Sequence, residues 1–229
     1  MLFRSSIKHW PEGERPREKL LERGAGALSD AELLAILLRV GTRGMSAVDL
    51  ARYLLNGFGS LGKLMNADIK SLSSYKGMGT ASFTQFAVVR EIGRRILSEE
   101  LRENIIFSNP QTVANYLRLN LGHERVEVSY ALLLNRQNQL IAMRELSRGT
   151  VAENTVYIRE IVKLALDEYA DSLIIAHNHP GGSARPSEAD IGFTKRLAQA
   201  LDLVDVSLLD HFIVTAKEVC SLRETGYMD

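Results

Sequence analysis

The residues best suited to chemistry are His177 and His179, which directly follow an apolar run at 173–176. The run predicts a buried strand. Side chains at positions i and i+2 of an extended strand point to the same face, so both imidazoles can reach one ion. A pair of histidines at this spacing therefore indicates a metal site.

Asp190 is the third candidate ligand. Pro180, Gly181 and Gly182 predict a turn after the histidines, and Ser187 then begins a helix with Asp190 in its first turn. Two imidazoles and one carboxylate leave a fourth tetrahedral position open, as in catalytic zinc sites, although iron, nickel or manganese also accept such ligands. A second interpretation is a capping box formed by Ser187 and Asp190, and it does not exclude the first.

The elements that must position these ligands lie in residues 105–229. Helical and strand-like segments alternate there, so we expect a mixed α/β (α+β) domain. The predicted strands cover 126–134, 139–146, 172–176 and 204–215, the last as one or two strands. The predicted helices cover 110–121, a segment from 155 or 157 to 169, and 187–201.

Residues 1–104 lack strand-like alternation and predict a small all-helical domain, with a boundary near residues 103–108. Ser29 or Asp30 is a candidate helix cap, and residues 57–59 are expected to end a helix. The predicted helices cover 16–21, 31–38, 46–55, 68–74 and 81–101.

The composition sets broad limits on function. The 229 residues carry a formal net charge of +0, so no general attraction to nucleic acid or anionic membranes is implied. Cys220 is the single cysteine, which excludes an intrachain disulfide and a cysteine-rich zinc motif and favours a reducing, cytoplasmic compartment. No run approaches the roughly 18 apolar residues of a membrane span, so no membrane contact is expected. The sequence does not indicate an oligomeric state.

The spacing of His177, His179, Ser187 and Asp190 matches the H-x-H-x7-S-x2-D pattern of JAMM (MPN+) metalloproteases at all four positions. The chain resembles the RadC branch of that family over nearly its full length, departing at Gly181, where RadC proteins usually carry serine. The resemblance implies a JAMM/MPN-like zinc hydrolase domain with one zinc ion per chain and a peptide or isopeptide substrate of unknown identity. The RadC-like stretches are 148–150, 159–160, 177–190 and 209–211.

The resemblance also assigns catalytic roles. JAMM enzymes use a glutamate just before the first strand of the domain as general base and acid, and Glu127 occupies that place, after the predicted helix at 110–121 and before residues 130–134. Its other interpretation is a partly exposed strand glutamate. Glu145, near the end of the second predicted strand, is the alternative. Ser187 would donate a hydrogen bond to the tetrahedral oxyanion.

Two other polar residues lie near the motif. His211, beside Asp210, has two interpretations: a residue that orients a ligand's ring, or a satisfied structural histidine. Asn178 points away from the two ligands in an extended strand, so we expect a structural role for it.

A competing function comes from residues 72–95. The segment 72–81 resembles a helix-hairpin-helix turn, whose glycines expose backbone N–H groups to a phosphate. Ser82 stands where DNA-binding versions often carry lysine, and such turns also serve helix packing or protein contact. The alternative is therefore a DNA-binding, DNA-repair-associated protein; a metal-free scaffold is less consistent with the intact ligand set. The nearby cations are Lys76, Arg90, Arg94 and Arg95.

Overall fold

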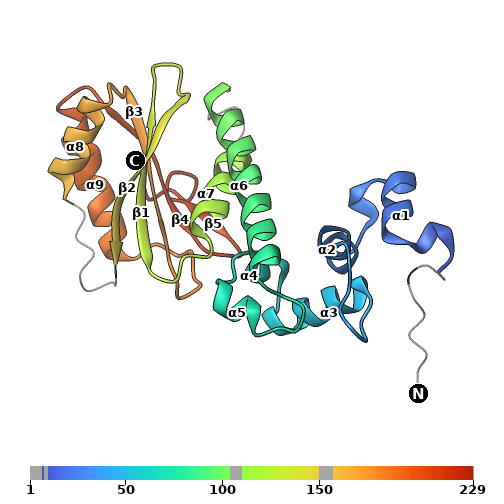
Figure 1. Cartoon of the computed structure of the whole chain (residues 1–229). Coiled ribbons are helices and arrows are strands. Elements are labelled where there is room, and N and C mark those ends of the chain that lie inside the picture. The colour runs from blue at the N-terminus through green and yellow to red at the C-terminus, as the bar shows by residue number, and fades with distance from the viewer. Residues whose placement is uncertain (1–6, 8–9, 104–109, 150–156, 229) are drawn as a thin grey trace. The chain divides into compact units, whose positions relative to one another are not determined.

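The computed structural model describes residues 7, 10–103, 110–149 and 157–228, and the chain divides into two compact units, Met1–Arg90 and Glu91–Asp229 (Figure 1). The division falls inside the long helix α6 (Thr80–Glu103). The predicted domain boundary near 103–108 lies almost entirely outside the described residues, and it stays a prediction.

The first unit is helical, as predicted, and the described part of it holds no strand beyond an isolated bridge between Thr42 and Met45. Its helices and short 3₁₀ turns are η2 (Glu12–Glu14), α1 (Pro16–Arg23), η3 (Ala25–Ala27), α2 (Asp30–Leu38), α3 (Ala47–Phe58), α4 (Leu61–Met65), α5 (Ile69–Ser73) and the first part of α6.

Helix α3 corrects one expectation. It was predicted to stop before Gly57, but it continues through Gly57 to Phe58 and ends at Gly59, whose φ of 82° is the left-handed conformation of a helix C-cap. Gly57 lies against the ring of Tyr75, where any side chain would collide with the phenol. Close packing therefore explains this glycine better than helix termination does.

The second unit is built on a five-stranded mixed sheet in the order β2-β1-β3-β4-β5. Strand β1 is antiparallel to β2 and β3, while β3 and β4 are parallel. Helix α7 covers one face, and α8 and α9 cover the other (Figure 1). The elements are α7 (Pro110–Leu121), β1 (Glu127–Leu134), β2 (Leu140–Gly149), α8 (Ile158–Asp167), β3 (Ser172–Asn178), α9 (Glu188–Asp202), β4 (Ser207–Val214) and β5 (Val219–Ser221).

The predicted α/β (α+β) class is confirmed. Strand β3 is buried along its whole length and lies at the centre of the sheet. Leu173 and Ile175 pack with the core cluster beneath α8 and α9, whereas Ile174 and Ala176 pack with the cluster beneath α7. By the same alternation, His177 faces α9.

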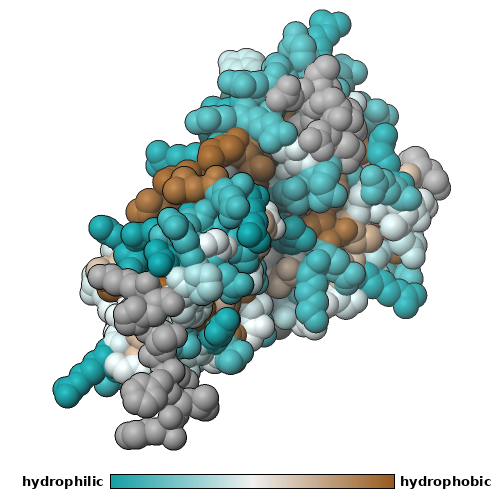
Figure 2. Space-filling model, turned by 90° about the vertical axis from the view of Figure 1, so that its right-hand side faces the viewer, coloured by the Kyte–Doolittle hydropathy of each residue, from teal (hydrophilic) through white to brown (hydrophobic). Residues whose placement is uncertain are grey.

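The surface view in Figure 2 is mostly hydrophilic, with separate hydrophobic areas. Across the described parts of the chain, no helix combines the length and apolar character that crossing a membrane requires.

Candidate metal centre

The end of β3 brings the two histidines together. His177 is 4% exposed, and its Cα pairs with Ser129 on β1 and with Ile213 on β4. The backbone N–H of His179 donates to Val214 O at 2.9 Å, so pairing with β4 continues one residue past the strand. The i, i+2 prediction is confirmed, because the two Nε2 atoms lie 3.0 Å apart.

Asp190 reaches the same point from the start of α9. The chain reverses at Gly182, which has a φ of 89° and donates its N–H to His179 O. Ser187 caps α9 in a complete capping box with Asp190. Asp190 Oδ2 accepts from Ser187 N at 2.8 Å and from Ser187 Oγ at 2.6 Å, while Oδ1 lies 3.3 Å from His177 Nε2. The capping box is confirmed and leaves Asp190 Oδ1 directed at His177, so it does not exclude the ligand role, which stays a prediction.

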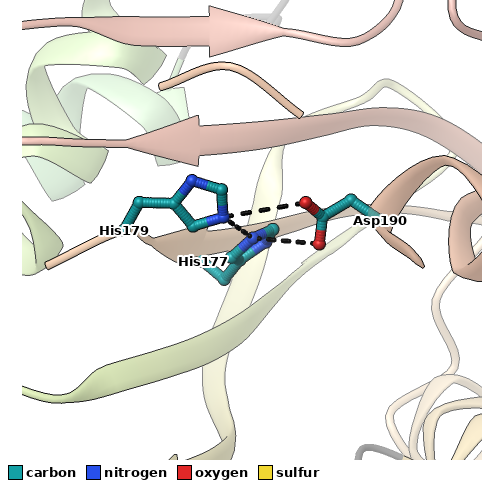
Figure 3. Close-up of side chains that lie close together, drawn as sticks. All are labelled: His177, His179 and Asp190. Carbon is teal, nitrogen blue, oxygen red and sulfur yellow. Dashed lines mark hydrogen bonds and ion pairs between the residues drawn. The ribbon is translucent and has the colours of Figure 1, made fainter. Parts of the chain in front are cut away.

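The three side chains converge on one point (Figure 3). One potential ligand atom from each of His177, His179 and Asp190 lies within 4.8 Å of the others. The separations between individual atoms are 3.0 Å for the two Nε2 atoms, 3.3 Å for His177 to Asp190 and 3.7 Å for His179 to Asp190. Ligand atoms bound to a tetrahedral zinc at ordinary lengths lie about 3.3 Å apart, so the cluster fits a zinc ion.

The position of the ring proton of His179 supports the fit of a zinc ion. His179 Nδ1 lies 2.9 Å from Ser183 O, and a carbonyl can only accept, so Nδ1 carries the proton. In neutral His179 the Nε2 lone pair then faces His177. Burial lowers the pKa of His177 to about 4, which keeps its ring neutral. Two imidazoles directed at one carboxylate form a donor set that suits a divalent cation.

The carboxylate of Asp190 is held in its charged form. Burial alone would raise its pKa, but the hydrogen bonds from Ser187 and the neighbouring histidines outweigh that effect, and the pKa lies below its ordinary value. Asp190 is therefore a ready anionic ligand at neutral pH.

Glu127 lines the same cavity as the three ligands, a space of about 670 Å³. Burial raises its pKa, and the charge of Asp190 adds to this while His179 opposes it. Asn178 fixes the neighbouring backbone: its Oδ1 accepts from Val128 N at 2.7 Å and its Nδ2 donates to Val126 O at 3.0 Å. The structural role expected for Asn178 is confirmed, and it holds the segment that carries Glu127.

Comparison with known proteins agrees with this geometry. Residues 107–227 match the family model described as the RadC-like JAB domain, and residues 7–84 match the model of the UPF0758 N-terminal domain. A UPF0758 protein of Neisseria meningitidis serogroup B is 82% identical over 223 residues, covering 97% of this chain and 99% of its own length. UPF0758 proteins of Aromatoleum aromaticum and Stutzerimonas stutzeri are 54% and 51% identical, covering 97% of this chain and 100% of theirs.

The chain belongs to the RadC (UPF0758) family. The resemblance inferred from the histidine motif is thereby confirmed. The RadC-like JAB domain coincides with the described sheet and the helices that cover it, and the ligand cluster lies within the matched residues.

Within this RadC-like domain, the alternative base Glu145 is placed differently from Glu127. Glu145 is exposed and accepts hydrogen bonds from Tyr130 and Arg148 at 2.9 Å each. The Arg148 hydrogen bonds hold the pKa of Glu145 below its ordinary value. Glu145 is also absent from the residues that line the cavity, so the geometry favours Glu127.

Ser187 also lines the cavity of the RadC-like domain, although its hydroxyl is engaged in the helix cap. Its Oγ donates to Asp190 Oδ2 and accepts from Asp190 N at 3.2 Å. The predicted oxyanion role stays a prediction, since the hydroxyl would have to turn away from Asp190 to donate to a substrate.

Of the two interpretations of His211 in this RadC-like domain, the structure supports contact with the ring of a candidate ligand. Its Nε2 lies 2.8 Å from Nδ1 of His177, and its Nδ1 lies 2.6 Å from Thr194 Oγ1. Burial lowers the pKa of His211 to about 3. Thr194 was not singled out in the sequence, although its position one helical turn after Asp190 on α9 offered a signal.

The glycine turn of the RadC chain's first unit was the other predicted site. Gly77, with a φ of 88°, precedes α6 and lies against Thr42. Three of the four cations named in the prediction are already paired: Arg90 donates to Met65 O and to Asn66, and Arg94 and Arg95 both bind Glu91. Lys76 is exposed and has no side-chain partner among the described residues. The predicted DNA or protein contact through 72–95 stays a prediction.

Proposed function

We propose that this RadC family chain is a zinc-dependent hydrolase of the JAMM type that cleaves amide bonds in a peptide or isopeptide substrate. The observation that carries the proposal is the convergence of His177, His179 and Asp190 beside Glu127 in one cavity. Three protein ligands leave one tetrahedral position open, as a catalytic rather than a structural site requires. A zinc ion held there would supply Lewis-acid activation of a water molecule at neutral pH.

The chain's own residues have separate tasks in this proposal. Glu127 takes a proton from the attacking water on its carboxylate and returns it to the leaving amine. Its raised pKa suits both halves of that transfer, because it brings the carboxyl closer to neutral pH. Ser187 donates a hydrogen bond to the oxyanion from the N-terminal end of α9. The single cysteine, Cys220, is consistent with the cytoplasmic location that we propose.

The test compares metal content and peptidase activity of wild type, His177→Ala and the control His123→Ala, each purified with zinc present. We expect about one zinc per chain in wild type and in the control, and a loss of zinc in His177→Ala. Activity on a peptide library should disappear with a chelator and return with zinc. A wild-type chain that holds no metal under these conditions would show the proposal to be wrong.

A further inference from the structure

Three hydrogen bonds connect the candidate ligands His177 and Asp190 through two buried side chains. His177 Nδ1 lies 2.8 Å from His211 Nε2, His211 Nδ1 lies 2.6 Å from Thr194 Oγ1, and Thr194 Oγ1 donates to Asp190 O at 2.6 Å. His177, His211 and Thr194 are 4%, 2% and 1% exposed, so bulk water does not compete for these bonds. The series begins on one ligand and ends on the backbone of another.

The direction of each bond follows from what each atom can do. The Asp190 carbonyl only accepts, so the Thr194 hydroxyl donates its one proton there. Thr194 Oγ1 must then accept from His211, which places the proton of a neutral His211 on Nδ1. His211 Nε2 is therefore an acceptor, and His177 Nδ1 donates to it. The proton of His177 is thus on Nδ1, and its Nε2 lone pair faces His179 and Asp190.

A β-bulge brings His211 to the correct face of the sheet. Leu173 pairs with Leu208, but the next residue, Ile174, pairs with Asp210, so β4 carries one extra residue. Such an insertion re-aims the side chains that follow it. Leu208 packs beneath α8 and α9, and simple alternation would turn His211 toward α7; the bulge turns it back toward His177.

We propose that Thr194 and His211 are positioning residues that hold His177 in its Nδ1-protonated tautomer and so direct its Nε2 lone pair at the ion. The inference rests on the metal site of the proposed function. Partners on the outer nitrogen of a ligating histidine fix its tautomer and ring orientation. Here the same hydrogen bonds also anchor α9, which carries Asp190, to β4 and β3.

The first test needs no variant and no metal. Histidine-selective ¹⁵N labelling of the full metal-free chain reports which ring nitrogen of each histidine carries the proton. We expect Nδ1 protonation for both His177 and His211. A proton on Nε2 of His177 would overturn the proposal.

The second test measures zinc affinity by competition with a chelator in three variants of the full chain. Thr194→Val keeps the side-chain shape but removes the hydroxyl, and we expect about 10- to 100-fold weaker zinc binding together with mixed tautomers of His211 and His177. Thr194→Ser restores the hydroxyl and should restore both readouts. Thr112→Val removes another buried helix hydroxyl, one that donates to Glu100, and should change neither.

The two proposals fail in different ways. If the wild-type chain binds zinc but hydrolyses nothing, the proposed hydrolase is wrong, while tautomers and affinity still decide the role of Thr194. If Thr194→Val matches wild type in both readouts, the proposed positioning role of Thr194 and His211 is wrong, and the hydrolase proposal is unaffected. A Thr194→Val chain that does not fold would leave the wild-type tautomers as the deciding measurement.

Discussion

The ligand cluster at the end of β3 and the glycine turn before α6 were both read from short motifs, but they differ in where their polar groups are directed. At β3, the outer nitrogens of His177 and His179 are bound to the protein, so the inner nitrogens face one another. In the second region, two of the cations predicted to assist, Arg94 and Arg95, lie further along α6 and are bound to Glu91 of the same helix. Hydrogen bonds within the protein therefore direct the two histidines toward one point, whereas ion pairs within the protein already occupy the two arginines.

The comparison also separates two uses of a capping box. Ser46 caps α3 with Asp49 in a complete capping box, and among the described residues Asp49 belongs to no cluster of potential metal ligands. Ser187 caps α9 with Asp190, whose second carboxylate oxygen remains directed at His177. The same local motif becomes part of a candidate site only where a strand end delivers further ligands to it.

The largest expected effect is on turnover, in the variant Glu127→Gln beside the ligand cluster. Because the amide cannot accept a proton, turnover should fall by about 10²- to 10⁴-fold, while zinc content stays at the wild-type level. Glu145→Gln is the matched control, and it should keep its activity because Glu145 lies outside the cavity lining. Full turnover by Glu127→Gln on a confirmed substrate would exclude Glu127 as the base.

A second prediction concerns the pH dependence of stability, which should differ between the two units. Folding keeps His177 and His211 neutral, with pKa values of about 4 and about 3, whereas the unfolded chain protonates them near 6.5. Their stabilising contribution is therefore complete above pH 6.5 and is lost as the pH falls toward 4, by up to about 1.4 kcal/mol per pH unit for each histidine.

Hydrogen exchange on the full metal-free chain between pH 7 and 5 measures this loss. Amides of β3 and β4 should lose protection free energy as the pH falls, and those of α2 and α3, in whose unit no described residue is a histidine, should change less. His211→Asn should reduce the slope in the sheet. An equal slope in both units would contradict the assignment to these histidines.

A smaller effect is expected from the helix caps. Ser187→Ala and Ser46→Ala should each lower the free energy of unfolding by about 1 kcal/mol, because each removes an N-cap acceptor. Only Ser187→Ala should also weaken zinc binding, since only that box holds a candidate ligand. Zinc affinity by chelator competition and chemical denaturation measure the two consequences. Equal zinc affinity in both variants would show that the cap does not influence the site.

The smallest effect is expected at the glycine turn. Of the four cations named for this contact, Arg90, Arg94 and Arg95 are already paired, and Lys76 is the one without a side-chain partner among the described residues. Duplex DNA binding should therefore show a slope of log affinity against log salt of only about −1, which Lys76→Ala removes and a chelator does not affect. A steep slope would mean that the arginines exchange their partners for phosphates.

Local patterns predicted much of this molecule. The i, i+2 histidines and the helix start at Ser187 were sufficient to predict that the three candidate ligands converge, because strand alternation and capping depend on neighbouring residues alone. The three-residue strand β5 was not recognised as a separate element, since so short a segment has little pattern of its own. The contact between His211 and His177 was not predictable, because it depends on a bulge that changes which face of β4 each residue occupies.

Asn178 has a consequence that reaches beyond its hydrogen bonds. It stands between the two ligand histidines in the chain, yet its side chain holds the backbone on either side of Glu127. The two histidines and Glu127 are therefore tied to one strand end, so a shift of β3 should move them together, whereas Asp190 is carried separately by α9. The distance between the histidines and the Glu127 carboxyl is therefore set by two side-chain hydrogen bonds and not by the loop that follows His179.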